Sequence, residues 1–517
     1  MLDAMRPCLP PAIAVAITLA LLTLSATRAA AAETAVSTAM SSISSADLRR
    51  HVEVLADDML EGREAGSRGG HAAAHYLGRE FQKHRLAGGA SPKSYYQTFG
   101  AQYRNILGLL EGSDPQLKRE LIVVSAHYDH VGYGNEQNSF GPTGYIHNGA
   151  DDNASGAAAL MELVEAFAQL EPRPARSILF ALWDGEEKGL LGSEHWVSHP
   201  TWPLAQVRLM INLDMVGRLR QEKIELYGGR TSAGLRRLVS TSNAATNLLV
   251  DFSWTMREDS DHYSFYKRGI PVLMFHTGLH GDYHRPSDDV EKLNFAGMQR
   301  LAQMLFTLIR QLADEPRLAP FRRAAQGESA SVQQARERPL PPLPGRLGVT
   351  WDASDERQGR GLRVTHVAAG SAAARAGVRP GDRLVKFAGR EIRDGNSFCT
   401  WVLAAQNPVS LAVARGGASQ PVELRVQLVG QPLRLGISWR VDDAEPGAVI
   451  LARVAPHSPA ARAGLRVNDR LYEVAGQRFA NDAEFRQLVA NPTTDALEML
   501  AERQGRLRAV RLKFAVP

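Results

Sequence analysis

Residues that can bind a metal ion or move a proton stand directly after several apolar runs of this sequence. These imidazole, carboxylate and phenol groups are His127 and Asp129, Glu186 and Glu187, Asp214, and Tyr283 and His284, with Asp151 and Asp152 preceding a helical segment. Taken singly, each is as well explained as a loop, capping or surface residue. Together they indicate a metal centre, because carboxylates and imidazoles that share one crevice are costly to bury unless a cation neutralises them.

The apolar runs themselves predict the scaffold that brings these groups together. Runs of strand length alternate with helical patterns such as Gly156–Leu170, and they cover Leu121–Ala126, Ser177–Trp183, Leu209–Leu213 and Pro271–Phe275. Continuous apolar strands separated by amphipathic helices are typical of an α/β fold with a mostly parallel central sheet flanked by helices. Because ligands of such sheets bind at the carboxyl ends of the strands, we expect the distant groups to meet in one crevice.

Five ordered motifs connect these residues to a known family. They are Ser125–His130, Asn148–Gly156, Trp183–Ser193, Asn212–Gly217 and Tyr283–Asp288. Together they resemble the M28 metallopeptidases, the bacterial leucyl-type aminopeptidases, over roughly Ala46 to Leu312. The resemblance implies a zinc exopeptidase fold and hydrolysis of N-terminal residues from peptides.

The resemblance also implies a ligand set for two Zn²⁺ ions. Asp151 would bridge the two ions, with His127 and Asp214 completing one site and Glu187 and His284 completing the other. Nitrogen and oxygen donors of this kind suit zinc and leave positions for water and substrate.

Two further residues take catalytic roles in this resemblance. Glu186 would act as general base, taking a proton from the attacking water and passing it to the leaving amine. Tyr283 would donate a hydrogen bond to the oxyanion, or else pack beside the neighbouring ligand. His130, His276 and His280 lie near the motifs but occupy no ligand position of the family.

Supporting residues are also expected around the ligands. Asp129 would accept a hydrogen bond from the nitrogen of His127 that faces away from the metal. Asp261 would support the site from behind the ligands, and the unusual cis peptide bond of the family would fall between Asp151 and Asp152.

The N-terminal segment predicts export from the cytoplasm, to the periplasm or the medium. Arg6, the apolar stretch Ala12–Leu24 and a run of alanines before residue 33 are typical of a cleaved signal peptide over residues 1–32. Of the two cysteines, only Cys399 would remain, so no internal disulfide is expected.

An internal repeat follows a Pro-rich linker. The segments Arg346–Trp351 and Ala374–Leu384 return as Arg434–Trp439 and Ala461–Leu471. The copies resemble PDZ domains, which add an extended peptide to a sheet edge. Loops at Gly348 and Gly436 would then hold the carboxylate of peptide C-termini, unless the modules only pack on their neighbours.

These observations predict five segments and one leading function. The segments are a signal peptide (1–32), a peptidase domain (33–314), a linker (315–345) and small β-rich PDZ-like domains (346–430 and 431–517). The function is an exported di-zinc aminopeptidase acting on peptides or proteins. The alternatives are a glutaminyl-cyclase-like zinc transferase and a PDZ scaffold with an inactive peptidase domain. The 60 basic and 55 acidic residues are interspersed, so nucleic acid is not an expected partner, and no stable membrane span is expected after signal cleavage.

Overall fold

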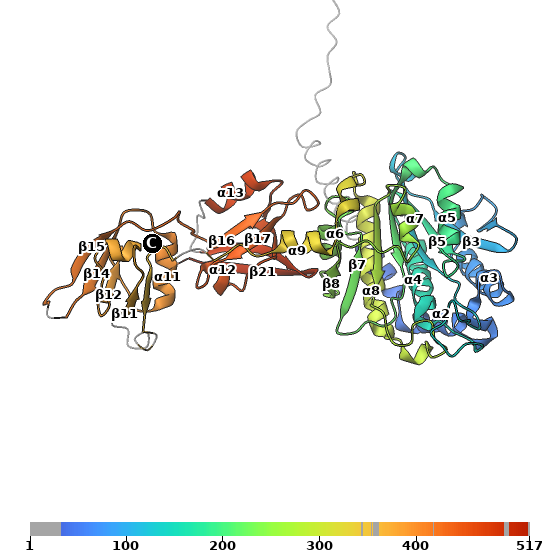
Figure 1. Cartoon of the computed structure of the whole chain (residues 1–517). Coiled ribbons are helices and arrows are strands. Elements are labelled where there is room, and N and C mark those ends of the chain that lie inside the picture. The colour runs from blue at the N-terminus through green and yellow to red at the C-terminus, as the bar shows by residue number, and fades with distance from the viewer. Residues whose placement is uncertain are drawn as a thin grey trace, which may run out of the picture. The chain divides into compact units, whose positions relative to one another are not determined.

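The computed structural model describes residues 33–342, 345–352, 354, 361–416, 418–490 and 496–514. The expected signal peptide lies outside these residues. The chain divides into two compact units, Met1–Ser329 and Ala330–Pro517 (Figure 1). Among the described residues, no helix combines the length and the apolar character needed to cross a membrane.

A nine-stranded mixed sheet forms the centre of the first unit, in the order β1-β3-β5-β4-β6-β9-β7-β8, with β2 paired to β3. Its strands are β1 (Ala87–Gly88), β2 (Tyr96–Phe99), β3 (Tyr103–Leu110), β4 (Leu121–His127), β5 (Ser177–Trp183), β6 (Val207–Leu213), β7 (Lys223–Tyr227), β8 (Leu249–Phe252) and β9 (Val272–His276). The four central strands β5, β4, β6 and β9 run parallel to one another. These are the four apolar runs of the sequence, so the α/β fold with a parallel central sheet is confirmed.

Helices cover both faces of this sheet. They are α2 (Ser45–Leu55), α3 (Arg68–Lys83), α4 (Gly156–Gln169), α5 (Leu191–Ser198), α6 (Leu235–Ser242), α7 (His262–Tyr266) and α8 (Phe295–Asp314). Ile122 and Val124 of β4 share a buried cluster with α2, α3, α4, α6 and α8, whereas Leu121 and Val123 share one with α5 and α7. Successive side chains of a strand face opposite sides, which explains why these strands are apolar throughout. Single helical turns lie at Asp58–Arg63, Leu117–Arg119, Leu204–Gln206, Val290–Lys292 and Arg323–Gly327.

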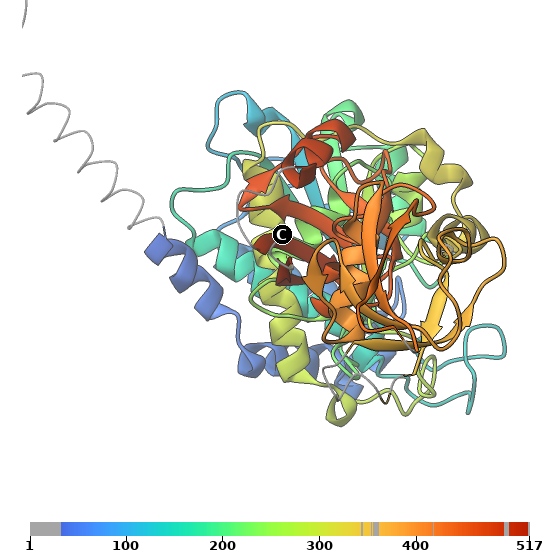
Figure 2. The same ribbon diagram turned by 90° about the vertical axis from the view of Figure 1, so that its left-hand side faces the viewer.

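The second unit contains α9 (Ala330–Glu337) and two β-rich modules, drawn in orange and red in Figure 1 and Figure 2. The first module has β10 (Val349–Trp351), β11 (Leu362–Val367), α10 (Ala372–Arg375), β12 (Arg383–Phe387), β13 (Arg390–Glu391), α11 (Gly395–Ala404), β14 (Val409–Ala414) and β15 (Val422–Val426). The second has β16 (Ile437–Arg440), β17 (Val449–Val454), α12 (Pro459–Arg462), β18 (Arg470–Val474), β19 (Gln477–Arg478), α13 (Asp482–Ala490), β20 (Ala496–Arg503) and β21 (Arg506–Lys513). Both six-stranded sheets are antiparallel and have the same strand order, so the sequence repeat is a repeat of structure.

Two glutamates within the segment expected as a linker (315–345) form ion pairs with buried arginines. Glu328 accepts hydrogen bonds from Arg230 and Arg322 of the first unit. Glu337, at the end of α9, pairs with Arg470 of the second module at 2.9 Å. Part of the linker therefore packs on the second repeat, although the first repeat follows it in the chain.

Candidate metal centre

The parallel strands bring the chemically active side chains to one edge of the sheet. His127 is the last residue of β4, Asp214 directly follows β6, and Glu186 and Glu187 follow β5 after a short turn. His284 lies in the segment after β9. Because β5, β4, β6 and β9 are neighbours in this order, groups far apart in sequence become adjacent.

One group of side chains surrounds the imidazole of His127. Its Nε2 atom lies 3.4 Å from Asp214 Oδ1 and 3.4 Å from Asp152 Oδ1. Glu186 Oε2 is 3.9 Å from the same nitrogen. Asp214 and Asp152 thus approach the same nitrogen, and the donor atoms of His127, Glu186 and Asp214 all lie within 4.8 Å of one another.

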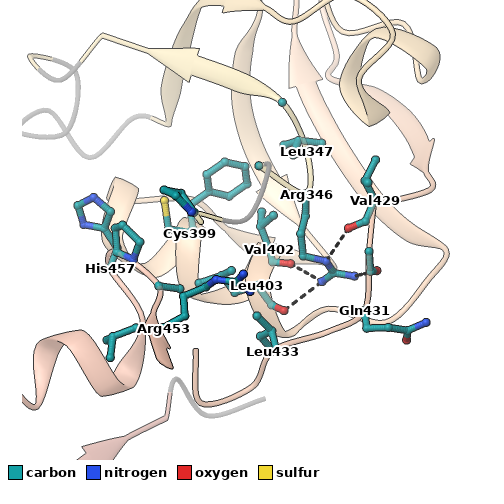
Figure 3. A pocket seen from close by; sticks show the side chains of 18 of the residues that line it. Arg346, Leu347, Cys399, Val402, Leu403, Val429, Gln431, Leu433, Arg453 and His457 are labelled. Atoms are coloured by element: carbon teal, nitrogen blue, oxygen red, sulfur yellow. Dashed lines mark hydrogen bonds between the residues drawn. The ribbon is translucent and has the colours of Figure 1, made fainter. Parts of the chain in front are cut away.

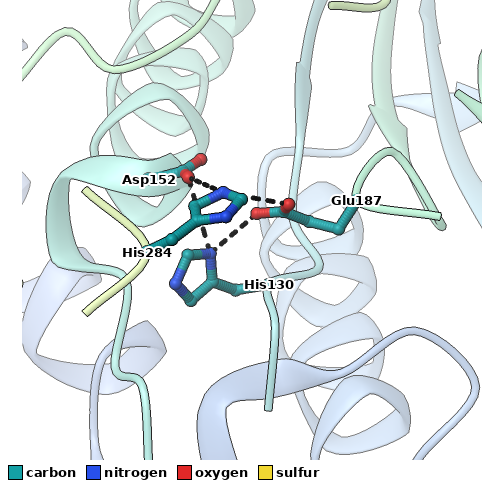
Figure 4. Close-up of side chains that lie close together, drawn as sticks. All are labelled: His130, Asp152, Glu187 and His284. Atoms are coloured by element: carbon teal, nitrogen blue, oxygen red, sulfur yellow. Dashed lines mark hydrogen bonds and ion pairs between the residues drawn. The ribbon is translucent and has the colours of Figure 1, made fainter. Parts of the chain in front are cut away.

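A second group surrounds the imidazole of His284 (Figure 4). Its Nε2 atom lies 3.1 Å from Asp152 Oδ2 and 3.1 Å from Glu187 Oε2. His130 Nδ1 approaches Glu187 Oε1 at 2.9 Å. The two oxygens of Asp152 therefore face different groups, and this carboxylate joins them.

The prediction that Asp151 bridges the two groups is wrong. Asp151 Oδ1 accepts a hydrogen bond from Gly217 N at 2.6 Å, and its Oδ2 lies 3.0 Å from His280 Nε2. The cis peptide bond is likewise one residue later than expected, between Asp152 and Asn153. Adjacent side chains in this irregular turn point in different directions, and the central position belongs to Asp152.

Contacts from distant parts of the chain set the orientation of this turn, Ala150–Ser155. Asp288 Oδ2 accepts the backbone N–H groups of Asp151 at 2.8 Å and of Asp152 at 3.1 Å. Asn153 Oδ1 accepts the N–H of Met215, just beyond β6, at 3.2 Å. These bonds tie the turn that carries Asp152 to the end of β6 and to the segment that follows β9.

The site concentrates negative charge in a buried place. The side chains of Asp152, Asp214, Glu186 and Glu187 are only 4%, 9%, 10% and 8% exposed. Burial raises the pKa of Glu186 well above its usual value. Burial alone would lower the pKa of His127, but the carboxylates of Glu186 and Asp214 outweigh it and raise that pKa. The surroundings thus favour a positive charge at their centre.

Unsatisfied atoms give a direct test of whether a cation fits. Asp152 Oδ2 and His284 Nε2 are buried and have no hydrogen-bond partner among the described residues, although they lie 3.1 Å apart. Buried polar atoms normally have partners, and imidazole nitrogen with carboxylate oxygen is a donor set that zinc prefers. The residues present therefore fit a pair of zinc ions sharing Asp152.

Asp129 supports the site differently from the expectation. His127 Nδ1 donates to the backbone carbonyl of Asp129 at 3.1 Å, while the carboxylate is 3.8 Å from this nitrogen. The carboxylate instead accepts the N–H groups of Glu186 at 3.1 Å and Glu187 at 3.3 Å. Asp129 thus positions all three site residues, partly through its backbone.

Asp261 is fully buried, and burial raises its pKa to about 7.

Tyr283 lies against the ligand set. Its ring stacks on that of His284, with centroids 3.9 Å apart, and the ring of Phe140 lies 5.8 Å away. Burial, followed by the negative charges of Asp152 and Glu187, raises the pKa of Tyr283. Its hydroxyl therefore stays protonated, as a hydrogen-bond donor must.

Sequence reasoning missed His130, whose side chain is fully buried within the second group. Its backbone N–H donates to Arg63 O at 3.2 Å. The position matches no ligand of the resembled family, so the motif comparison left it out. The sequence feature that could have identified His130 is its position in the strand-end motif of His127, two residues after Tyr128.

The first PDZ-like module contains an apolar groove of about 500 Å³ between β10 and α11 (Figure 3). Its wall includes Gly348, Val349, Trp351, Phe398, Val402 and Leu403, together with Arg453 and His457 of the second module. At its base, Arg346 donates hydrogen bonds to the carbonyls of Val402, Leu403 and Val429. β10 is an edge strand of its sheet, and PDZ domains add an extended peptide to a sheet edge.

The two expected carboxylate loops differ. Gly348 and Gly436 both have positive φ, and a Cβ atom at either would meet Ser371 or Ser458 at 2.3 and 2.0 Å. Glycine is therefore required at both positions. The N–H of Gly436, however, donates to Leu433 O at 3.1 Å, so this loop N–H already has a partner within the chain.

Comparisons with known proteins agree with these observations. Residues 105–309 match the model of peptidase family M28, and residues 363–415 and 450–503 match that of the PDZ domain. Aminopeptidase YwaD of Bacillus subtilis is 30% identical over 39% of this chain and 43% of its own. Leucine aminopeptidase 1 of Trichophyton rubrum is 26% identical over 44% of this chain and 61% of its own. The crystal structure of the Legionella pneumophila LapA aminopeptidase is 22% identical, with a TM-score of 0.47, over 55% of this chain and 75% of that one.

The chain thus contains one segment that matches peptidase family M28, followed by two segments that match the PDZ domain. It spans less than two thirds of the length of the two curated relatives described above. Residues 105–309 are thus similar to peptidase family M28, and the relatives that this chain matches include proteins named aminopeptidases.

Proposed function

We propose that this protein is an exported di-zinc aminopeptidase that removes N-terminal residues from peptides. The observation that carries the proposal is the carboxylate of Asp152, whose two oxygens lie 3.4 Å from His127 Nε2 and 3.1 Å from His284 Nε2. One shared carboxylate between two such groups is the arrangement that suits a pair of metal ions. His127 with Asp214 and His284 with Glu187 would complete the two sites.

The side chains around the proposed ions have complementary tasks. Bound zinc ions would supply an activated water and a polarised substrate carbonyl. Glu186 would take the proton of the attacking water and return it to the leaving amine, and its pKa, raised by burial, favours proton uptake. The protonated hydroxyl of Tyr283 would donate to the oxyanion.

Two arguments favour free N-termini as the substrates. The related proteins YwaD and leucine aminopeptidase 1 are named aminopeptidases. The buried carboxylates also create a negative potential that would attract an α-ammonium group.

Metal analysis combined with a pair of matched substrates tests this function. Dialysed protein should hold two zinc equivalents, and aminoacyl-anilides with a free amine should be cleaved much faster than the same compounds after N-acetylation. One zinc equivalent with cyclisation of N-terminal glutamine would favour the transferase, and absence of both activities would favour the scaffold.

We further propose that the groove of the first PDZ domain binds apolar peptide C-termini. A protein ending at Ser329 keeps every proposed zinc ligand, and the two units have separate hydrophobic cores. Removal of the PDZ pair should leave anilide hydrolysis unchanged and raise KM for longer peptides, because only remote binding is lost. Equal KM values for long peptides would contradict substrate binding by the groove.

Export is the remaining element of the proposal, and it rests on the residues before position 33. N-terminal sequencing of the secreted or periplasmic protein should find a start near Ala32 or Glu33. A start at Met1 in the recovered protein would contradict cleavage.

A further inference from the structure

His130 has the position of an additional metal ligand. Its Nδ1 atom lies 2.9 Å from Glu187 Oε1 and 3.7 Å from Asp152 Oδ2. Neighbouring donor atoms of a tetrahedral zinc ion are about 3.4 Å apart when the bonds are about 2.1 Å long. His284 Nε2 lies 3.1 Å from Asp152 Oδ2 and 3.1 Å from Glu187 Oε2. The distances among these four side chains are therefore close to those between the ligands of one zinc ion. Figure 4 shows the four side chains directed toward one another.

The surroundings hold the ring of His130 in this orientation. A Cβ atom at Gly149 would come within 2.5 Å of His130 Cδ2, so the ring edge lies directly against that glycine. The backbone of His130 is bound to Arg63 O, and the guanidinium of Arg63 in turn donates to Gly149 O at 2.9 Å. The ring also meets that of His284 edge to face, with centroids 5.5 Å apart. Little freedom remains for Nδ1 to turn away from the site.

The two ring nitrogens of His130 have different surroundings, because Nδ1 faces the carboxylate of Glu187 at 2.9 Å. Nε2 is buried and has no hydrogen-bond partner among the described residues. A cation bound at Nδ1 would take the place of the proton that this nitrogen shares with Glu187, and the proton of the neutral ring would then lie on Nε2.

We propose that His130 binds, through Nδ1, the zinc ion held by Asp152, Glu187 and His284. This inference rests on the proposed di-zinc function and makes the two sites unequal. Four protein donors close the His130 site, whereas His127, Asp152 and Asp214 leave the other ion with open positions for water and substrate. Closed donor sets are typical of firmly held zinc, and open sets of catalytic zinc.

Zinc binding by three variants of the full-length protein tests the inference. The zinc-free protein is titrated against a competing chelator, and its folding is checked by circular dichroism. His130→Ala and His130→Asn should each weaken the tighter of two zinc sites by more than about 100-fold, beyond the 10–100-fold typical of a residue that only hydrogen-bonds to a ligand. His147→Ala, which removes another buried histidine of the same region, should leave that site nearly unchanged.

The asparagine variant separates a ligand from a hydrogen-bond donor. Its amide can still donate to Glu187 but binds zinc poorly, so an affinity equal to that of the unaltered protein would overturn the proposal. X-ray absorption at the zinc edge, with one equivalent bound, should show two imidazoles in the unaltered protein and one in either variant. If the unaltered protein bound two zinc equivalents and were fully active, but its first zinc ion had only one imidazole ligand, His130 would be refuted as a ligand. The proposed peptidase function would still stand. Absence of zinc binding in the unaltered protein would refute both.

Discussion

Two buried clusters of charged side chains, one in each unit, balance their charge in opposite ways. In the second unit, the buried guanidinium of Arg470 contacts both oxygens of Glu445, at 3.0 and 3.1 Å, and Glu337 at 2.9 Å. In the first, the carboxylates of Asp152 and Glu186 lie buried among imidazoles and other carboxylates. Arg63 is buried nearby, yet it donates its hydrogen bonds to backbone carbonyls.

This difference separates charges that stabilise a fold from charges that form a site. A buried ion pair within the chain satisfies its own electrostatics, and its loss is costly. Carboxylates gathered without such partners need a cation from outside. The buried cluster of the second unit thus balances its own charge, whereas the buried carboxylates of the first unit fit a metal ion from outside the chain.

Replacement of Asp152 should break this arrangement most severely. Asp152→Asn removes the negative charge shared by both groups, so we expect loss of both zinc ions and a fall in kcat of more than about 10⁴-fold. Zinc content after dialysis and anilide turnover measure the two effects. Asp151→Asn is the matched control and should keep both metals, because its carboxylate contacts Gly217 and His280 instead. If the Asp151 variant lost both metals and the Asp152 variant kept them, the assignment would be reversed.

Glu186→Gln should separate chemistry from metal binding. Loss of the proton acceptor should lower kcat by about 10²–10⁴-fold, while the zinc content stays at two, since no proposed ligand is removed. Glu187→Gln should instead weaken metal binding, because Glu187 contacts His284 and His130. A loss of turnover below tenfold in the Glu186 variant would exclude it as general base.

Glu445→Gln tests the opposite unit. It removes one carboxylate partner of the Arg470 guanidinium, which keeps Glu337 at 2.9 Å and the nearby charge of Glu502, and breaking a buried pair costs about 3–5 kcal/mol. We expect a lower unfolding temperature for the PDZ pair in calorimetry and unchanged anilide hydrolysis. Glu473→Gln, which weakens a pair with the exposed Arg478, should change stability by less than about 1 kcal/mol. Equal stability of the two variants would contradict the role given to Arg470.

Glu162 in α4 sharpens the comparison, because it is a buried carboxyl outside the metal site. Burial raises its pKa to about 8 from 4.5. Between these values the unfolded chain has released a proton that the folded chain retains, so stability falls as pH rises from about 4.5 to 8. Glu162→Gln removes this dependence. The free energy of unfolding of the variant minus that of the unaltered protein should therefore be larger at pH 8 than at pH 5. We expect a difference of more than about 1 kcal/mol, since each pKa unit corresponds to about 1.4 kcal/mol.

Urea unfolding at both pH values measures this effect. Glu165→Gln, on the same helix and partly exposed, should follow the pH profile of the unaltered protein. Identical profiles for the Glu162 variant would show that this carboxyl is ionised in the fold.

Local pattern determined the architecture of this protein. The runs that became β4, β5, β6 and β9 are apolar throughout because both faces of the sheet are covered, and their ends carry the acids and histidines of the site. The repeated segments around Gly348 and Gly436 likewise identified two modules of one fold. Such features depend on periodicity and on residue type, which a sequence displays directly.

Only the tertiary structure decided which side chains meet at the centre. Asp151 and Asp152 are alike in sequence, and their different directions come from bonds to Asp288 and Gly217, which lie 137 and 66 residues away from Asp151. The same holds for His130, which enters the metal site because its ring packs against Gly149. In an irregular turn the side-chain direction depends on long-range contacts, and no periodic pattern records them.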